Sequence, residues 1–431
     1  MAVKAGVACL VKILLIPQVR VAVISHAFPP SPHANGKRPY YIAQGFLEAG
    51  WEVDVFTSNI SCDLDYEETL NHSQCRVIRV SDPVVRWLDR LKPCRFLYRV
   101  ALSVANACMW PDFYAVWARN VFKRLRKEGD YDRVLAFVFP PSVYLAAKKD
   151  MVDRSWMFDL QESVTPQHKI LPRRSPLQKW RLPQLTRLEK KALHAAGQVV
   201  YTAATNREAY ISAGLVPKKT SAHIPYFFDA NVFGSEKNEI VRGFEIRYFG
   251  AFDWRGSRSP QVFLKALSGF LDKYPEAREQ TKFVFYGMWN AKHDILLKDL
   301  NLEDVTDVRG SVPYGKYLQE VKRAPVLLLV VSSEHNLFMP SKIVDYFGSG
   351  RPILAFVPEG SEMRHVLEEA NMEEQTVSET DIKGGTRTIE TLWTRYSSGT
   401  LGEIDANTNF WSSDVQIPRY LNLAAMLNTK K

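Results

Sequence analysis

The most constraining feature of this sequence is a long alternation of short apolar runs with segments of helical periodicity. Continuous apolar runs between amphipathic helices are typical of parallel β-sheets that carry helices on both faces. In the first half of the chain, strands are expected at 19–28, 51–58, 131–139, 155–160 and 197–203, and another starts at 221 and leads into a connector. Helices are expected between or after them at 34–50, 140–150, 185–196 and 205–214. Such repeated strand, helix, strand units predict a Rossmann-like domain.

The same alternation restarts after an aromatic, proline-containing connector at 225–235. The second set of expected strands and helices lies at 243–250, 259–274, 282–287, 291–300, 304–312, 315–324, 325–332, 340–350, 351–357 and 361–370. Since 431 residues exceed what one hydrophobic core usually serves, two domains are expected. The predicted fold class is α/β, with two doubly wound Rossmann-like domains facing one another across a cleft. We place the domains at 1–228 and 229–405, and expect a helix in 406–431 to pack back on the N-terminal domain.

The net charge of +9 is concentrated in the first half of the chain. Between Arg76 and Lys127 there are 12 Lys and Arg residues against three Asp, and between Pro166 and Lys191 there are eight against one Glu. The segment 82–128 is helical, aromatic and rich in arginine, so we predict a basic helical insertion there. Two interpretations stay open: a hairpin whose arginines cover apolar core, or an element that binds an anionic membrane surface. Nucleic acid is not expected as a partner, because no known binding module is present.

The cysteines and the N-terminus bear on location. Five scattered cysteines without a C-x-x-C motif favour reduced thiols in a cytoplasmic protein. The first 19 residues are apolar but are interrupted by Lys12, and could be a signal, an anchor or an ordinary extension. No run of 18 apolar residues occurs, so no membrane-spanning helix is expected.

Ligands of open α/β sheets bind beyond the carboxyl ends of the strands, so the loops there are the candidate site. After the first strand, Asn35, Gly36 and Lys37 could hold an anion at a helix start, although a plain turn is an equal alternative. Gly250 ends the first strand of the second domain, and Arg255 and Arg258 follow it. Arginine suits bidentate phosphate contact, but these two could also be solvated loop residues.

The most informative stretch is FMPSKIVDYFGSGR, from Phe338 to Arg351. Pro340 fits the first turn of a helix, and Ser341 and Lys342 then lie at the positive end, where a phosphate is stabilised. Asp345 lies one turn on, where its carboxylate could accept both hydroxyls of a ribose while Lys342 meets a diphosphate. The alternative is an ordinary ion pair between Lys342 and Asp345 on one helix face.

These stretches, together with ISHAFPP, NGKRPYYIAQGFLEAGWEVDVFTS, IPYFFDANVF and YFGAFDWRGSRSP, resemble retaining glycosyltransferases of the GT-B fold. The similarity is to the family-four group that includes capsule and O-antigen enzymes, and it extends from about Val19 to Ala370. The resemblance implies that the C-terminal domain binds a UDP- or GDP-linked sugar and the N-terminal domain an acceptor. It implies no metal and no cofactor beyond the nucleotide sugar.

The resemblance also distributes the candidate roles. Arg258 and Lys342 are the candidate catalytic residues on the donor diphosphate, and Asp345 holds the ribose where the family usually has glutamate. The other donor-side candidates are Gly250, Arg255, Gly287, Val312, Pro340 and Ser341, and the acceptor-side candidates are Asn35, Gly36, Lys37, Asp159 and Glu162.

The resulting hypothesis is a retaining glycosyltransferase of surface polysaccharide synthesis. Its acceptor would be a lipid-linked saccharide, which places the enzyme on the cytoplasmic face of a membrane. The alternatives are a nucleotide-sugar epimerase of the same fold and a non-catalytic membrane-binding protein.

Overall fold

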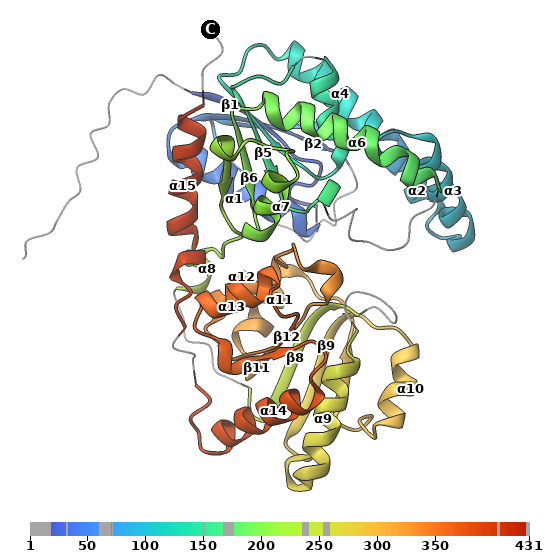
Figure 1. Cartoon of the computed structure of the whole chain (residues 1–431), viewed down its shortest axis with the longest axis vertical. Helices are drawn as coiled ribbons and strands as arrows, with labels where there is room; N and C mark the ends of the chain where they lie inside the picture. The colour runs from blue at the N-terminus through green and yellow to red at the C-terminus, as the bar shows by residue number, and fades with distance from the viewer. Residues whose placement is uncertain are drawn as a thin grey trace, which may run out of the picture.

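The structure is a computed structural model. It describes residues 19–31, 33–59, 70, 72–149, 151–166, 176–234, 241–252, 259–402 and 406–427. Two α/β domains lie one above the other, and the helix at the end of the chain runs from the junction between them along the N-terminal domain (Figure 1).

The N-terminal domain contains a seven-stranded sheet in the order β3-β2-β1-β4-β5-β6-β7, in which every strand pair is parallel. Its strands are β1 (Arg20–Ile24), β2 (Glu52–Ser58), β3 (Cys75–Val80), β4 (Arg133–Phe137), β5 (Trp156–Leu160), β6 (Gln198–Tyr201) and β7 (Ser221–His223). The order reverses between β1 and β4, which makes that point the place where a doubly wound sheet binds its ligand.

Both faces of this sheet are buried. One face packs against α4 (Ala115–Lys127), η2 (Pro141–Lys149), α6 (Pro176–Ala195) and α7 (Ala204–Ser212), with Trp117 and Phe122 fully buried. The other face packs against α1 (Lys37–Glu48) and α15 (Ser413–Ala425), so the C-terminal helix completes the core of the N-terminal domain. This two-sided burial explains the continuous apolar strands in the sequence.

The basic segment 82–128 divides into two parts. Helix α4 is the crossover helix that covers the sheet between β3 and β4. Helices α2 (Pro83–Leu91) and α3 (Arg95–Cys108) pack on one another and project away from the sheet (Figure 1). Asp82, which is fully buried, caps α2 by accepting a hydrogen bond from Val85 N and also contacts His26 Nε2 at 3.0 Å. None of the helices in the described part of the chain combines the length and the apolarity needed to cross a lipid bilayer.

The C-terminal domain has a six-stranded parallel sheet in the order β10-β9-β8-β11-β12-β13. Its strands are β8 (Phe244–Ala251), β9 (Thr281–Met288), β10 (Thr306–Arg309), β11 (Val326–Val330), β12 (Ile353–Val357) and β13 (Thr376–Ser378). Its helices are α9 (Gln261–Lys273), α10 (Lys292–Asp299), α11 (Tyr314–Lys322), α12 (Lys342–Ser349), α13 (Glu362–Glu369) and α14 (Ile382–Ser397). The sheet is again enclosed, with α9 and α14 in one cluster and α11, α12 and α13 in the other.

The chain crosses between the domains twice, and the two crossings lie side by side. The connector that carries α8 (Ala230–Phe233) pairs with the segment before α15, since Phe228 N donates to Trp411 O and Ser413 N donates to Phe228 O. A third link is Glu362, whose carboxylate accepts hydrogen bonds from Ala204 N and Thr205 N at the start of α7. The prediction of two Rossmann-like domains is confirmed by both sheets. Among the described strands and α-helices, β3, β13, α8 and α14 were not predicted.

Candidate functional site

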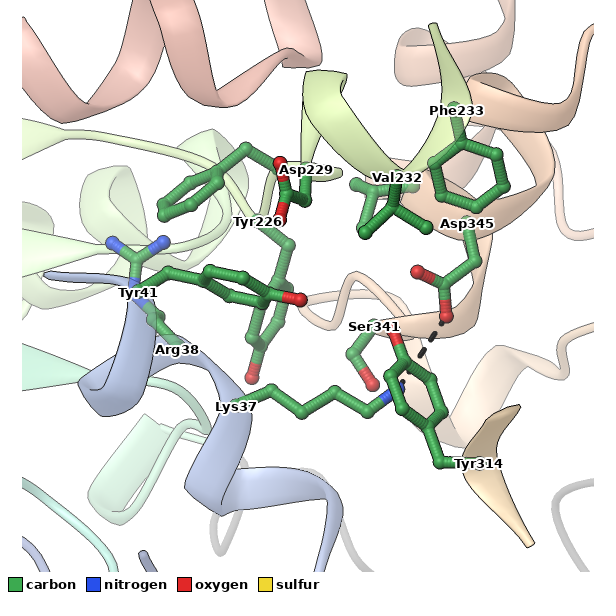
Figure 2. A pocket seen from close by; sticks show the side chains of 12 residues that line it. Lys37, Arg38, Tyr41, Tyr226, Asp229, Val232, Phe233, Tyr314, Ser341 and Asp345 are labelled. Carbon is green, nitrogen blue, oxygen red and sulfur yellow. Dashed lines mark ion pairs between the residues drawn. The ribbon is translucent and has the colours of Figure 1, made fainter. Parts of the chain in front are cut away.

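The carboxyl edges of the two sheets face one another, and the residues between them line a small cavity (Figure 2). Its lining comes from α1, the connector, α8, α11 and α12: Lys37, Arg38, Tyr41, Tyr226, Phe227, Asp229, Val232, Phe233, Tyr314, Ser341, Val344 and Asp345. The cavity volume is about 30 Å³, far below the few hundred cubic ångströms of a typical ligand pocket. A ligand of ordinary size could enter this cavity only if the domains parted or the lining side chains moved.

Helix α12 supplies the C-terminal wall of the cavity. Ser341 is its N-cap residue and Gly350 its C-cap residue, in a left-handed conformation that glycine adopts readily. The helix begins at Lys342, so Pro340 lies just before the N-cap and not in the first turn as predicted. The N-cap side chain of Ser341 makes no capping hydrogen bond to the helix.

Asp345 points from α12 into the cavity, and its side chain is 10% exposed. Its Oδ2 atom accepts a hydrogen bond from Tyr317 Oη at 2.9 Å. Burial and the neighbouring Asp345 carboxylate raise the pKa of Tyr317 well above its ordinary value, so the tyrosine stays a donor at neutral pH. The carboxylate is thus oriented by Tyr317 from within the C-terminal domain.

Lys37 reaches this carboxylate from the other domain. Its Nζ lies 3.6 Å from Asp345 Oδ2 and 3.4 Å from the ring centroid of Tyr314, as the dashed line in Figure 2 shows for the ion pair. The sequence assigned Lys37 to the acceptor side, but in the structure it spans the cleft to the residue expected to bind the donor. Lys37 therefore belongs to both sides of the candidate site.

Lys342 lies at the carboxyl end of β8. Its Nζ donates to Phe249 O at 2.7 Å and lies 4.0 Å from the ring centroid of Tyr248. It is also adjacent to Gly250, because a Cβ placed on that glycine would lie 3.3 Å from the amine. The charge of Lys342 is thereby held beside Gly250 at the carboxyl edge of the sheet.

Two glycines that the sequence analysis assigned to the donor side lie at this edge of the sheet. Gly250 and Gly287 have φ values of 136° and 138°, which side chains rarely allow. A Cβ on Gly287 would lie only 1.8 Å from Gly250 O, so β8 and β9 could not end this close together with any other residue. Arg255 and Arg258 follow this edge in the sequence but lie outside the described residues.

The loop between β10 and α11 carries Val312, which is partly buried against the core under α11 and α12. The following helix brings Tyr314 and Tyr317 to the cleft with their rings stacked at a centroid distance of 5.7 Å. The sequence singled out Val312 but missed Tyr317. The signal available was the spacing of two tyrosines three residues apart, which places both on one helix face.

On the acceptor side, Asn35 and Gly36 form η1 (Ala34–Gly36) directly before α1. Gly36 is buried with a φ of −81°, which other residues also adopt, and a Cβ there would make a tight contact at 3.3 Å from Phe28 N. Asn35 O accepts a hydrogen bond from Gln161 Nε2 at 3.4 Å. Glu162 is exposed at the end of β5.

Asp159 does not reach the cavity. It is fully buried, and its carboxylate is occupied by Arg38 Nε at 2.9 Å and by Tyr420 Oη at 3.0 Å. The Arg38 guanidinium also donates to Ile224 O and Pro225 O of the connector. Asp159 thus joins β5, α1, the connector and α15, which gives it a structural role in place of the acceptor contact suggested by the sequence.

The chain is similar to known proteins in its fold and not in its sequence. No protein-family model matches the chain, and no curated protein matches its sequence. The solved structure of WaaG, a glycosyltransferase involved in lipopolysaccharide biosynthesis, superposes with a TM-score of 0.63 at 12% identity, covering 94% of this chain and 99% of that one. A sucrose-phosphate synthase from Thermosynechococcus elongatus superposes with a TM-score of 0.55 at 17% identity and 95% coverage of both chains. HepE of Anabaena, solved in complex with UDP-glucose, gives 0.58 at 13% identity, covering 94% and 99%.

The chain has the GT-B fold. At sequence identities this low, the similarity concerns the arrangement of the backbone and not the chemistry of the site. In the GT-B arrangement seen here, the cavity at Lys37 and Asp345 lies between the two Rossmann-like domains.

Proposed function

We propose that this protein is a glycosyltransferase that moves a sugar from a nucleotide sugar to a saccharide acceptor. The observation that carries the proposal is the position of Asp345, an oriented carboxylate one turn into α12, at the carboxyl edge of the C-terminal sheet and facing the other domain. A carboxylate there can accept ribose hydroxyls while the helix N-terminus and Lys342 stabilise a diphosphate. The GT-B neighbours support this, since one is solved with UDP-glucose and another with UDP-2-fluoro glucose.

In this proposal the nucleotide-sugar donor lies along the carboxyl edge of the sheet in the C-terminal domain. Lys342 and Arg258 neutralise the diphosphate as it leaves, and the charge that develops there is where positively charged groups lower the barrier most. Ser341 and Pro340 shape the start of α12, the glycine pair at Gly250 and Gly287 leaves room for the phosphates, and the loop at Val312 meets the base. Arg255 contributes a further positive charge.

The acceptor enters from the N-terminal domain, past Asn35, Gly36, Lys37 and Glu162. We infer that the reaction proceeds with retention, assisted by the donor's own phosphate, as the resemblance to the family-four enzymes implies. The acceptor is a lipid-linked saccharide of surface polysaccharide synthesis, and the enzyme works peripherally on the cytoplasmic face of the membrane.

The proposal is tested by incubating the purified protein with UDP-, GDP- and CDP-sugars and measuring nucleoside diphosphate release with and without lipid-linked saccharides. Release that depends on the acceptor and is lost in Asp345→Ala supports the proposal. Isomerisation of the donor sugar without net release would identify an epimerase. Absence of both nucleotide binding and release would overturn the assignment.

A further inference from the structure

One surface of the N-terminal domain is unusually apolar for exposed protein. Of the 12 most exposed large apolar side chains in the described part of the chain, seven lie on α2, α3 and the start of α6, so they are concentrated and not scattered. We call this set the hairpin surface: Trp87, Phe96, Leu97, Val100, Val104, Leu177 and Trp180. Phe96 is 74% exposed and Trp180 is 64% exposed, although aromatic rings gain most from leaving water.

The exposed side chains of α3 form a stripe. Phe96, Val100 and Val104 are spaced four residues apart and therefore share one face of the helix. Ala101 and Ala105, on another face, are buried against neighbouring elements. The large side chains thus point to solvent while the small ones face the protein, which is the reverse of an ordinary core-facing helix.

The start of α6 is fixed beside the end of α3. The guanidinium of Arg181 donates to Asn106 O at 2.6 Å and to Met109 O at 3.0 Å. These bonds hold the first turn of α6, with Leu177 and Trp180, next to the hairpin (Figure 1). The three helices therefore present one connected surface.

Positive charge surrounds the apolar side chains. Residues 83–108 carry five Lys or Arg residues and one acid, Asp89, which is paired with Lys92 at 2.8 Å. Arg86, Arg90, Arg95 and Arg99 are exposed on the same two helices. A surface that combines exposed aromatic rings with arginines and lacks unpaired acids is complementary to an anionic lipid interface.

The hairpin is anchored firmly to the catalytic side of the domain. Helix α2 follows the carboxyl end of β3, and its buried N-cap Asp82 contacts His26 in the loop after β1. That loop leads on to η1 and Lys37. A partner bound to the hairpin surface would consequently lie on the side of the domain where the acceptor enters.

We propose that the hairpin surface docks the protein on an anionic lipid bilayer, with Phe96 and Trp180 entering the interfacial region and Arg86, Arg90, Arg95 and Arg99 contacting lipid phosphates. The docking proposal rests on the proposed function in one respect: an enzyme with a lipid-linked acceptor needs to reach the membrane surface. The binding itself requires no transferase activity.

The test is flotation of the full-length protein with phosphatidylcholine vesicles, with and without phosphatidylglycerol, at low and high salt. Wild type should float with anionic vesicles only, and high salt should weaken binding. Arg95→Gln and Arg99→Gln should each weaken binding about 5-fold, and Phe96→Ser or Trp180→Ser about 10-fold. Ile295→Ser on α10 and Arg387→Gln on α14 are matched controls, because both are well exposed on the other domain.

The outcomes separate the possibilities. Equal binding to both vesicle types, insensitivity to salt, or hairpin variants that bind like wild type would overturn the proposal. A dimer that Phe96→Ser dissociates, in a protein that binds no vesicles, would show that the surface meets a second copy of the chain. Nucleoside diphosphate release with soluble acceptors, measured in parallel, shows whether failure of lipid binding leaves the proposed transferase function intact.

Discussion

Replacing Asp345 with alanine should weaken nucleotide binding strongly. In the structure the carboxylate is held by Tyr317 and paired with Lys37 at 3.6 Å, and it is nearly buried. If it accepts ribose hydroxyls, its loss removes hydrogen bonds to a charged group, which contribute about 1.5–3 kcal/mol. The dissociation constant for the nucleotide should therefore rise about 10- to 150-fold.

The ion pair with Lys37 also affects the measured affinity for the nucleotide. A ligand must displace the lysine before it can use the carboxylate, and a partly exposed ion pair contributes less than about 1 kcal/mol. In a Lys37→Met background no ion pair has to be broken, so the effect of Asp345→Ala should be larger by up to about 5-fold. The double-mutant cycle isolates this coupling from the ribose contact.

Isothermal titration with UDP and GDP on wild type, both single variants and the double variant provides the measurement. Asp272→Ala, on the exposed side of α9, is the matched control for removal of a carboxylate from the same domain. Circular dichroism confirms that each variant is folded. Affinities within twofold of wild type for both nucleotides in folded Asp345→Ala would refute the assignment of this carboxylate to the ribose.

Three further predictions concern charge, backbone and pH. Lys342→Met should lower turnover about 10²–10³-fold with little change in melting temperature, and near-normal turnover would show that this lysine is not on the leaving group. Gly287→Ala should destabilise the fold by about 1–3 kcal/mol from backbone strain alone, whereas Gly310→Ala, which has open space around it, should be nearly neutral in denaturant titration. Burial raises the pKa of Glu189, so its contribution to stability is complete below its unfolded-state pKa and is lost as pH rises through the folded-state pKa. Wild type should thus lose stability relative to Glu189→Gln from acid to neutral pH in urea unfolding, and parallel pH profiles would contradict this.

The strands that could be predicted are those buried on both faces, because their apolar runs are continuous. The sequence CRVIRV of β3 lies at the sheet edge, where Arg76 pairs with Asp54 and interrupts the apolar pattern. Helix α14 was missed because Gly384 and Gly385 lower the helix propensity of its start. The structure shows the reason for one of these glycines, since a Cβ on Gly385 would lie 2.7 Å from the ring of Phe356.

The local structure around the candidate site was predictable where it depends on neighbours in sequence. A helix that carries Lys342 and Asp345 one turn apart follows from local spacing, although it begins at Lys342 and not at Pro340. The partners could not be read in this way, because Lys342 is held by Phe249 and Asp159 is neutralised by Arg38 from distant elements. A polar residue after a buried strand can be a ligand contact or a structural joint, and only tertiary packing decides which.

The contact between Lys37 and Asp345 yields a last prediction about the motion of the domains. The two chain crossings and Glu362 involve backbone hydrogen bonds, whereas Lys37 contributes a partly exposed ion pair and should be the least costly contact to break. Lys37→Met should raise the ratio of open to closed molecules by up to about 5-fold. Spin labels on the exposed faces of α4 and α9, introduced after replacement of the native cysteines Cys9, Cys62, Cys75, Cys94 and Cys108, would report the interdomain distance distribution. A distribution identical to wild type would mean that the chain crossings and Glu362, and not this ion pair, hold the two domains together.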